Sequence, residues 1–295
     1  MPPGPRYTSF VVLLLAAACD PDRGAQLERT AAEREAAFAE RTTEVRAAGV
    51  ADRPVARWEL PGALSEVSGL AIAPDGRLFA HGDETGDLFE IDYRSGIVVK
   101  RFSLGPDDVT ADFEALAIRG STFWLLTSRG RLYEFEEGRN GERVPYRTAE
   151  PPVGEDCEEF EGMTVDGDAL VIACKKARKA FGGALHLYRW PVGSRSAERI
   201  EVPADSIRAR MPEWEEFSAS GITRRDDTGT FILVAGPEQG YLEVSAEGRI
   251  IVARALPADH GQPEGVAWTS DGMLFIADEA TGRTAAVTIY PEPLR

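Results

Sequence analysis

The sequence predicts an all-β protein, a five-bladed β-propeller of four-stranded antiparallel blades. From Pro54 onward, short runs rich in Val, Ile, Leu, Phe and Tyr are separated by Gly, Asp, Asn and Pro turns, without helical periodicity. A motif made of an acidic or hydroxyl residue, a small residue and an apolar strand occurs five times. The fifth copy lacks a fourth strand, and a spare strand precedes the first copy.

The repeated motif sets the number and size of the blades. Its copies read "EVSGLA", "DFEALA", "EFEGMT", "SASGIT" and "QPEGVA", and the aligned acidic or hydroxyl positions are 46, 47, 59 and 44 residues apart. Four-stranded units recurring at this period are typical of propeller blades. The longest offset contains an insertion, "DSIRARMPEWEEF". In the first unit the predicted strands are Gly69–Ala73, Leu78–His81, Asp87–Asp92 and Ile97–Ser103.

The two ends of the propeller domain, residues 54–295, are predicted to share one blade. The last copy supplies three strands, and the segment "PVARWELPG" at residues 54–62 can pair as the fourth. This closure removes the exposed edges that an open arrangement would leave. A ring with a sixth, degenerate blade is the alternative.

Residues 1–18 have the pattern of an export signal. Arg6 precedes the apolar run "SFVVLLLAAA", which is too short to span a bilayer as a helix. Cys19 follows directly and resembles the lipidated cysteine of a bacterial lipobox. The sequence thus predicts a lipoprotein of the bacterial cell envelope, held at the membrane by acyl chains such as palmitate. An ordinary cleaved signal with an incidental cysteine is the alternative.

The residue after the lipobox cysteine bears on the choice of membrane. Asp20 favours retention at the inner membrane, facing the periplasm, and the outer membrane is the alternative. Residues 19–53 then form a polar spacer between the anchor and the propeller. Gln26–Ala48 is rich in Ala, Glu and Arg, which favours a helix but offers no apolar stripe to bury. We therefore expect a helical or partly disordered spacer.

The overall charge excludes one class of partner. The formal net charge is −16, whereas nucleic-acid binding needs clustered Lys and Arg to contact phosphates. We expect no nucleic-acid partner.

Two cysteines of the propeller domain flank one predicted hairpin. Simple register would place Cys174 opposite Glu161, with Cys157 beyond its direct partner. A β-bulge could close that gap, and disulfides persist in oxidising compartments. A disulfide between Cys157 and Cys174 and a pair of free thiols both stay open.

The repeats resemble a known family. The pattern "SGLA … DFEALA … DCEEFEGM … LVIACKK … ASGIT … QPEGVAW" looks like the SdiA-regulated, YjiK-like bacterial β-propeller lipoproteins, from about Leu60 to the carboxyl terminus. Esterase-like phytase propellers and gluconolactonase-type propellers are more distantly similar. The resemblance implies the propeller fold and leaves the activity open.

Propeller geometry brings the repeated motif to one mouth of the central channel. The first strand of each blade is innermost, so its starting residues face one opening, and the small residue that follows lets neighbouring backbones approach closely. The second strand returns to the same mouth and adds Asp83, Arg129, Lys175, Lys176 and Asp278. The predicted ring residues are Ser68, Glu114, Glu161, Ser220 and Glu264.

Three carboxylates crowded at a mouth repel one another unless they are protonated or neutralised. A hard cation, most plausibly Ca²⁺, would be held by oxygen ligands. The metal-ligand candidates are Glu114, Glu161, Glu264, Asp83 and Asp278. Ion pairs with Lys175 or Arg129 would neutralise the ring instead, and the glutamates could simply brace neighbouring blades through backbone N–H groups.

Three functions are compatible with such a mouth. The first is an envelope-anchored propeller that binds a small molecule or an envelope protein there, with Ser68, Arg129, Lys175, Lys176 and Ser220 as ligand contacts. The second is a metal-dependent hydrolase of phosphate esters, carboxylic esters or lactones, in which His81 or His260 would move the proton. The third is a structural scaffold without a site.

Overall fold

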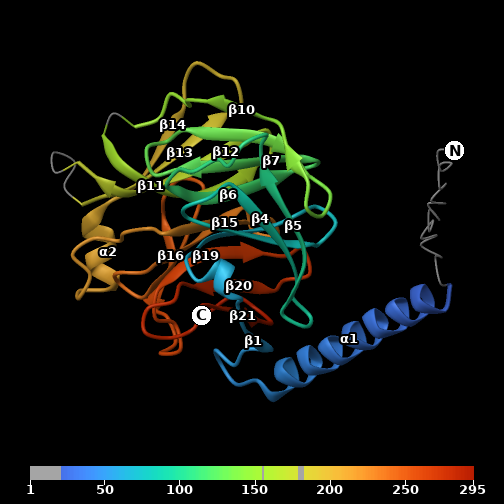
Figure 1. Cartoon of the computed structure of the whole chain (residues 1–295). Coiled ribbons are helices and arrows are strands. Elements are labelled where there is room, and N and C mark those ends of the chain that lie inside the picture. The colour runs from blue at the N-terminus through green and yellow to red at the C-terminus, as the bar shows by residue number, and fades with distance from the viewer. Residues whose placement is uncertain (1–20, 155, 179–182) are drawn as a thin grey trace, which may run out of the picture.

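The computed structural model describes residues 21–154, 156–178 and 183–295, and these form a five-bladed β-propeller (Figure 1). The predicted architecture is confirmed. Each first strand contacts the first strand of the next blade, and β19 (Pro263–Trp268) returns to β2 (Val67–Ile72) to complete the ring. The Cys19 and signal-peptide predictions lie outside the described residues.

Each blade is an antiparallel sheet whose strands follow the chain from the channel outward. Blade 1 consists of β2, β3 (Leu78–Gly82), β4 (Asp87–Asp92) and β5 (Ile97–Leu104). Blade 2 consists of β6 (Phe113–Arg119), β7 (Thr122–Thr127), β8 (Leu132–Glu136) and β10 (Tyr146–Ala149). Blade 3 consists of β11 (Cys157–Asp166), β12 (Ala169–Ala177), β13 (Leu185–Pro191) and β14 (Glu198–Val202). Blade 4 consists of β15 (Gly221–Arg225), β16 (Thr230–Ala235), β17 (Gly240–Val244) and β18 (Ile250–Ala255).

Blade 5 joins the two ends of the domain, as predicted. It consists of β19, β20 (Leu274–Asp278), β21 (Ala286–Tyr290) and β1 (Ala56–Glu59). The register of β1 on β21 places Ala56 opposite Ile289 and Glu59 opposite Ala286. A short 3₁₀ turn, η1 (Gly62–Leu64), then leads into blade 1.

Two elements lie outside the four-strand pattern. The short β9 (Arg143–Val144) pairs in parallel with β5 and adds a fifth strand to blade 1. The insertion before blade 4 contains α2 (Ala204–Arg210), and its Trp214 and Phe217 pack into the core between blades 3 and 4. The insertion therefore adds apolar packing at that interface.

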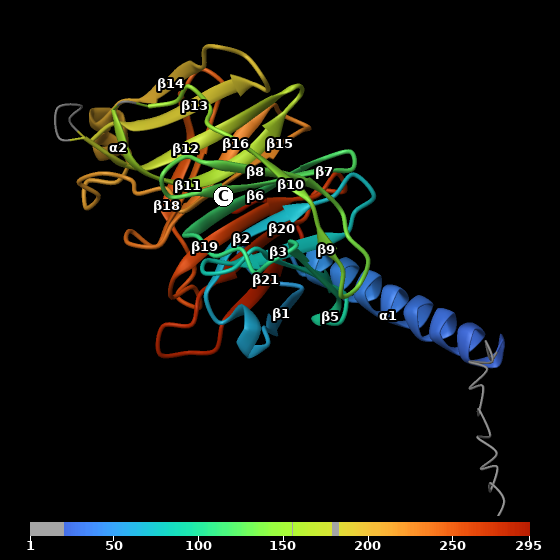
Figure 2. The same ribbon diagram turned by 45° about the horizontal axis from the view of Figure 1, so that its top comes forward.

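Helix α1 (Pro21–Ala48) precedes the propeller and runs outward from it in both views (Figures 1 and 2). Its carboxyl-terminal half is docked, because Phe38 and Val45 are buried against the blade 5–blade 1 core. The Phe38 ring packs edge-on against Tyr93 at 5.5 Å. The expectation that this segment offers no apolar stripe to bury is thus wrong for its second half. No helix of the described ranges is long and apolar enough to cross a membrane.

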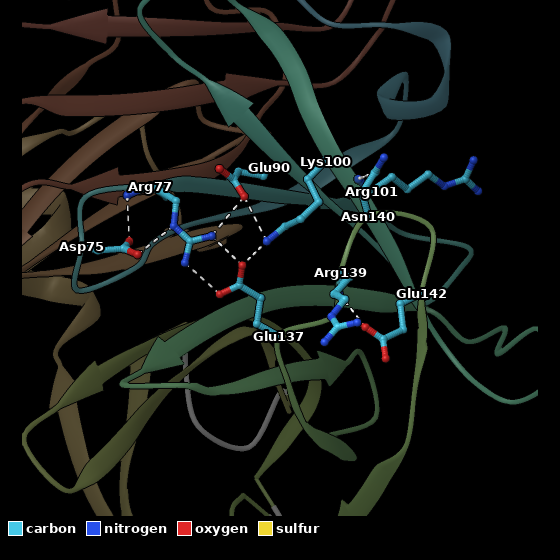
Figure 3. Close-up of polar contacts among 9 residues, drawn as sticks. All are labelled: Asp75, Arg77, Glu90, Lys100, Arg101, Glu137, Arg139, Asn140 and Glu142. Carbon is cyan, nitrogen blue, oxygen red and sulfur yellow. Dashed lines mark hydrogen bonds and ion pairs between the residues drawn. The ribbon is translucent and has the colours of Figure 1, made fainter. Parts of the chain in front are cut away.

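A charged network ties blade 1 to the segment that follows β8 (Figure 3). The Arg77 guanidinium donates to Glu137 Oε2 at 2.8 Å and to Glu90 Oε2 at 3.0 Å. Lys100 also pairs with both carboxylates. The Glu137 hydrogen bond from Arg77 outweighs burial and holds the pKa of that carboxyl at about 2. The network stabilises the contact between blades 1 and 2.

The β11–β12 hairpin carries a disulfide between Cys157 and Cys174, whose Cα atoms are 5.9 Å apart. The ladder is irregular between Cys157 and Gly162, so that Phe160, not Glu161, lies opposite Cys174. This is the bulge that the spacing required. The bridge therefore fixes the strand segment that carries Glu161.

Candidate functional site

The ring residues occupy the same irregular position in every blade. In blade 1 the register passes from Val67 to Gly69, so Ser68 has no partner across the ladder. In blade 4 both Ser220 and Gly221 lie opposite Val234. A β-bulge of this kind redirects a side chain. The equivalent bulged residues of blades 2, 3 and 5 are Glu114, Glu161 and Glu264.

Glycines after the ring residues allow the blades to approach closely. A Cβ atom on Gly221 would lie 2.8 Å from the Glu264 carbonyl oxygen, and one on Gly265 would lie 3.1 Å from the Leu70 amide nitrogen. Only glycine fits these contacts without a shift of the backbone. The close approach predicted from the repeat is present.

The five ring residues surround one small cavity of about 10 Å³ at the channel axis. Glu161 is only 7 % exposed, and its Oε2 atom has no hydrogen-bond partner among the described residues. The space suffices for about one water-sized group. Burial raises the pKa of Glu161, against the opposing hydrogen bond from Lys175.

Lys175 is the cation of the ring. Its Nζ lies 2.5 Å from Glu161 Oε1, and its charge also interacts with Glu264 and Glu114. Burial alone would lower the pKa of Lys175, but these carboxylates outweigh it and the pKa is raised. Of the two neutralising residues that the sequence suggests, Lys175 is therefore the one placed at the ring.

The other two glutamates retain protons over an unusual pH range. Burial, supported by the charges of Glu161 and Asp112, raises the pKa of Glu114 to about 9. Burial and the charge of Glu161 raise the pKa of Glu264 to about 7. Glu264 Oε1 accepts a hydrogen bond from Gln262 Nε2 at 2.7 Å, a contact that sequence reasoning missed.

The two ring serines differ in role. Ser220 Oγ accepts a hydrogen bond from the Gly236 amide at 2.8 Å and donates to the Pro263 carbonyl at 2.9 Å. Ser220 therefore braces blade 4 against blade 5. Ser68 Oγ has a weaker contact, 3.4 Å to the Glu66 carbonyl oxygen, and keeps capacity for another partner.

A second group of carboxylates lies at the rim of the same mouth. Burial and the charge of Glu66 raise the pKa of Asp83. Burial, then the charges of Asp83 and Glu66, raise the pKa of Glu279, which Lys175 opposes. These groups are therefore within electrostatic reach of one another and of the ring. We call the ring residues, Lys175 and these rim carboxylates (Glu66, Asp83 and Glu279) the acidic mouth.

Two basic candidates lie away from the ring. Lys176 is exposed and is 3.6 Å from Glu158 and 3.7 Å from Glu159. Arg129 is exposed at a separate cavity between blades 2 and 3. Neither lines the ring cavity, because successive residues of the exit loops point in different directions.

Asp278 does not face the ring, which corrects its proposed role as a ligand there. Its side chain is buried, 2.8 Å from His260 Nδ1 and 3.3 Å from Arg57. His260 Nε2 is in turn 2.8 Å from the Tyr290 hydroxyl. Both imidazole nitrogens are thus engaged in a buried network of blade 5, and His260 is not placed to move a proton at the mouth.

His81 is also fully buried, which removes it as a solvent-accessible base. Its Nδ1–H donates to the Gly82 carbonyl at 2.8 Å, and burial lowers the pKa of the imidazole to about 4. The imidazole of His81 fills the space beside Gly69, where a Cβ atom on Gly69 would lie 2.4 Å from His81 Nε2. His81 therefore packs behind the first inner strand.

The described residues contain no preformed metal centre. Across the described residues, no group of three or more His, Cys, Asp or Glu side chains is placed to hold a metal ion. One Glu161 oxygen already contacts the Lys175 ammonium, and Asp278 is turned away. Ca²⁺ at the ring would therefore compete with Lys175 for Glu161.

Comparison with known proteins supports the family resemblance over part of the chain. The SdiA-regulated family model matches residues 206–292, which contain most of the insertion, blade 4 and most of blade 5. No curated protein shows significant sequence similarity to the chain.

Solved structures resemble the chain in fold over 81% of its length. The glutaminyl cyclase of Myxococcus xanthus is 14% identical, with a TM-score of 0.54, and the match covers 81% of this chain and 95% of that one. The PQQ-bound aldose sugar dehydrogenase of Streptomyces coelicolor is 13% identical, with a TM-score of 0.52, covering 81% and 96% respectively. At these identities the likeness concerns the fold alone.

Proposed function

We propose that this protein is an envelope-anchored receptor that binds a positively charged ligand at the acidic mouth. The observation that carries the proposal is the buried Glu161 Oε2 atom, which lacks a partner and lies at the ring cavity. A buried carboxylate oxygen without a partner is costly, so a donor that reaches it gains binding free energy. Glu114 and Glu264 line the same cavity.

The size of the cavity selects the charged group. Room for about one water-sized group admits an ammonium head but not a guanidinium with its full plane. The body of the ligand would stay on the rim, where Glu66, Asp83 and Glu279 add negative charge. We therefore propose a primary amine, such as a polyamine or a lysine side chain of an envelope protein.

Anchoring in the envelope forms part of the same proposal. The Cys157–Cys174 disulfide supports an oxidising compartment, in agreement with the export signal. Attachment through acylated Cys19 at the inner membrane, facing the periplasm, is the arrangement we propose. Labelled palmitate should enter the wild-type protein but not Cys19→Ala, and incorporation into that variant would exclude this anchor.

Calorimetric titration with spermidine tests the binding function. We expect Glu161→Gln to weaken binding by about tenfold or more, because it removes a charged acceptor. Glu150→Gln is the matched control, since Glu150 is exposed and, among the described residues, pairs with Arg131 alone. Absence of spermidine binding to the wild-type protein would refute the proposal for free amines, and a lysine peptide would then test the protein-partner form.

Ca²⁺ stays a prediction that the same titration examines. If Ca²⁺ binds at the ring, Lys175→Met should strengthen its binding, because the competing ammonium is gone. If neither Lys175→Met nor Glu161→Gln changes the affinity for Ca²⁺, the Ca²⁺ site lies elsewhere.

One observation favours a hydrolase as the second candidate. Glu114 holds its proton to about pH 9 beside Glu161, whose carboxylate pairs with Lys175. A protonated and an ionised carboxyl side by side can act as acid and base. Turnover of a phosphate-ester, carboxylic-ester or lactone panel, lost in Glu114→Gln, would favour this candidate over the receptor. A protein that neither binds nor turns over any probe would be the structural scaffold.

A further inference from the structure

The opposite end of the channel holds a larger cavity, which the ring motif did not predict. We call this cavity of about 580 Å³ the funnel. Its wall comes from residues four positions after the ring residues, on the same face of the inner strands. These wall residues are Ile72, Ile118, Val165, Arg224 and Trp268.

The funnel is separate from the acidic mouth. Residues two positions after the ring residues line both cavities and form an apolar layer between them. Such a layer excludes polar groups from passing along the axis. The layer consists of Leu70, Leu116, Met163, Ile222 and Val266.

The funnel has the proportions of a ligand site. Its volume lies within the range of about 300–1,000 Å³ that is usual for small-molecule pockets. The floor is apolar, whereas the exposed lining as a whole is more polar than apolar, and Trp268 in the wall is only 9% exposed. The hydroxyl-bearing Thr164, Thr223 and Ser270 lie among the lining residues. A ligand with an apolar body and polar ends suits this lining.

The charged residues at the funnel divide into a set joined by ion pairs and two residues that form no ion pair with a described residue. Arg224 Nε lies 2.8 Å from Asp166, and Arg224 also pairs with Asp226, so these charges are matched. Arg119 stacks on Trp124 at 5.2 Å and forms no ion pair with a described residue. Asp271 forms none either.

These two residues come from two blades that are not adjacent. Arg119 ends the inner strand of blade 2, and Asp271 lies in the turn after the inner strand of blade 5, with blade 1 between them. Arg46 of α1 donates to the Asp271 carbonyl oxygen at 3.3 Å and holds that turn. A cation at one side and a carboxylate at the other match the two ends of a zwitterion.

We infer that the funnel binds a short apolar peptide as a zwitterion. The carboxylate of the peptide contacts Arg119, its ammonium contacts Asp271, and its apolar side chains pack on the wall and floor. A carboxylate gains from the guanidinium through charge-assisted hydrogen bonds. This inference does not depend on the function proposed for the acidic mouth.

Leucyl-phenylalanine, its N-acetyl derivative and its C-terminal amide provide the test. In the wild-type protein, blocking either end should weaken binding about tenfold, by loss of one charged contact. In Arg119→Gln the acid and the amide should bind equally, while acetylation still weakens binding. In Asp271→Asn the reverse should hold. Calorimetry with each of the three peptides measures these affinities in the wild type and in both variants.

Matched variants separate the funnel from the rest of the molecule. Arg147→Gln and Asp107→Asn remove exposed charges elsewhere and should leave both differences intact. Glu114→Gln should also leave them intact, because it alters the other mouth. Val165→Trp should narrow the funnel and weaken the binding of every peptide.

Two results would overturn the inference. The first is the absence of leucyl-phenylalanine binding at millimolar concentration in the wild-type protein. The second is an acid–amide difference that persists in Arg119→Gln, since the carboxylate would then be recognised elsewhere.

Discussion

Lys175 Nζ lies 2.5 Å from Glu161 Oε1 at the axis of the channel, and both side chains are largely buried. The pair joins an inner strand, β11, to the end of the next strand of the same blade, β12. It also sets the charge of the mouth, because one ammonium is shared among three glutamates.

Removal of Lys175 should therefore destabilise the fold. Lys175→Met leaves the Glu161 carboxylate buried and unpaired, at a cost on the order of 3 kcal/mol at neutral pH. Adding Glu161→Gln should recover most of that loss. Chemical denaturation of the single and double variants measures the coupling, and equal stabilities of Lys175→Met and the wild type would contradict it.

Stability should fall as the pH rises from about 5 to about 9. The pKa of Glu264 is raised to about 7 and that of Glu114 to about 9, so the native chain holds protons that the unfolded chain has released. By linkage, the free energy of unfolding then decreases with pH until each native group ionises. Glu114→Gln should flatten the decline between pH 7 and 9, as followed by Tm. An unchanged slope in that variant would show that Glu114 is not its source.

Loss of the disulfide should affect both stability and the mouth. Cys157 and Cys174 are 17 residues apart, and a bridge of this span contributes about 3 kcal/mol. Because Cys174 adjoins Lys175, the double serine variant should also bind spermidine more weakly. A reductant should reproduce both effects in the wild type and have none in the double variant. If affinity is retained while stability falls, the bridge does not position Lys175.

Docking of α1 should depend on a few apolar contacts. Phe38→Ala removes a buried ring that packs on Tyr93, a loss of about 3 kcal/mol, which should release the helix while the propeller stays folded. Limited proteolysis should then cut within residues 29–50. Glu40→Ala, on the exposed face, should leave the helix protected. Equal resistance of both variants would mean that other contacts hold α1.

The sequence was most informative where a pattern recurred. The predicted strand Asp87–Asp92 coincides with β4, and predicted Ile97–Ser103 differs from β5 by one residue. The five motif copies sufficed to bring Glu114, Glu161 and Glu264 together, because ring closure leaves little freedom for an inner strand. Local pattern and global architecture agree there.

The repeat pattern did not predict the direction in which individual side chains point. Asp278 ends a strand, but the bulge at Glu264 shifts the register, and Pro263 is paired with Asp278 while Gly265 is paired with Ala277. His81 and His260 are close in sequence to residues of the acidic mouth, but tertiary packing buries both side chains.

The docking of α1 could not be predicted from the sequence, whereas the funnel was missed although the repeat contains its positions. Phe38 and Val45 form too narrow a stripe to signal burial until Tyr93 is placed against them. The funnel could have been found by continuing the ring positions by two and then four residues along each inner strand.

The seam between β1 and β21 imposes an order on folding. The strand made first waits for a partner made almost last, so blade 5 cannot be completed during synthesis of the preceding blades. If the chain is exported, β1 would cross the membrane unpaired, and the propeller would be completed only after export. Premature closure is thereby avoided by the placement of one four-residue strand.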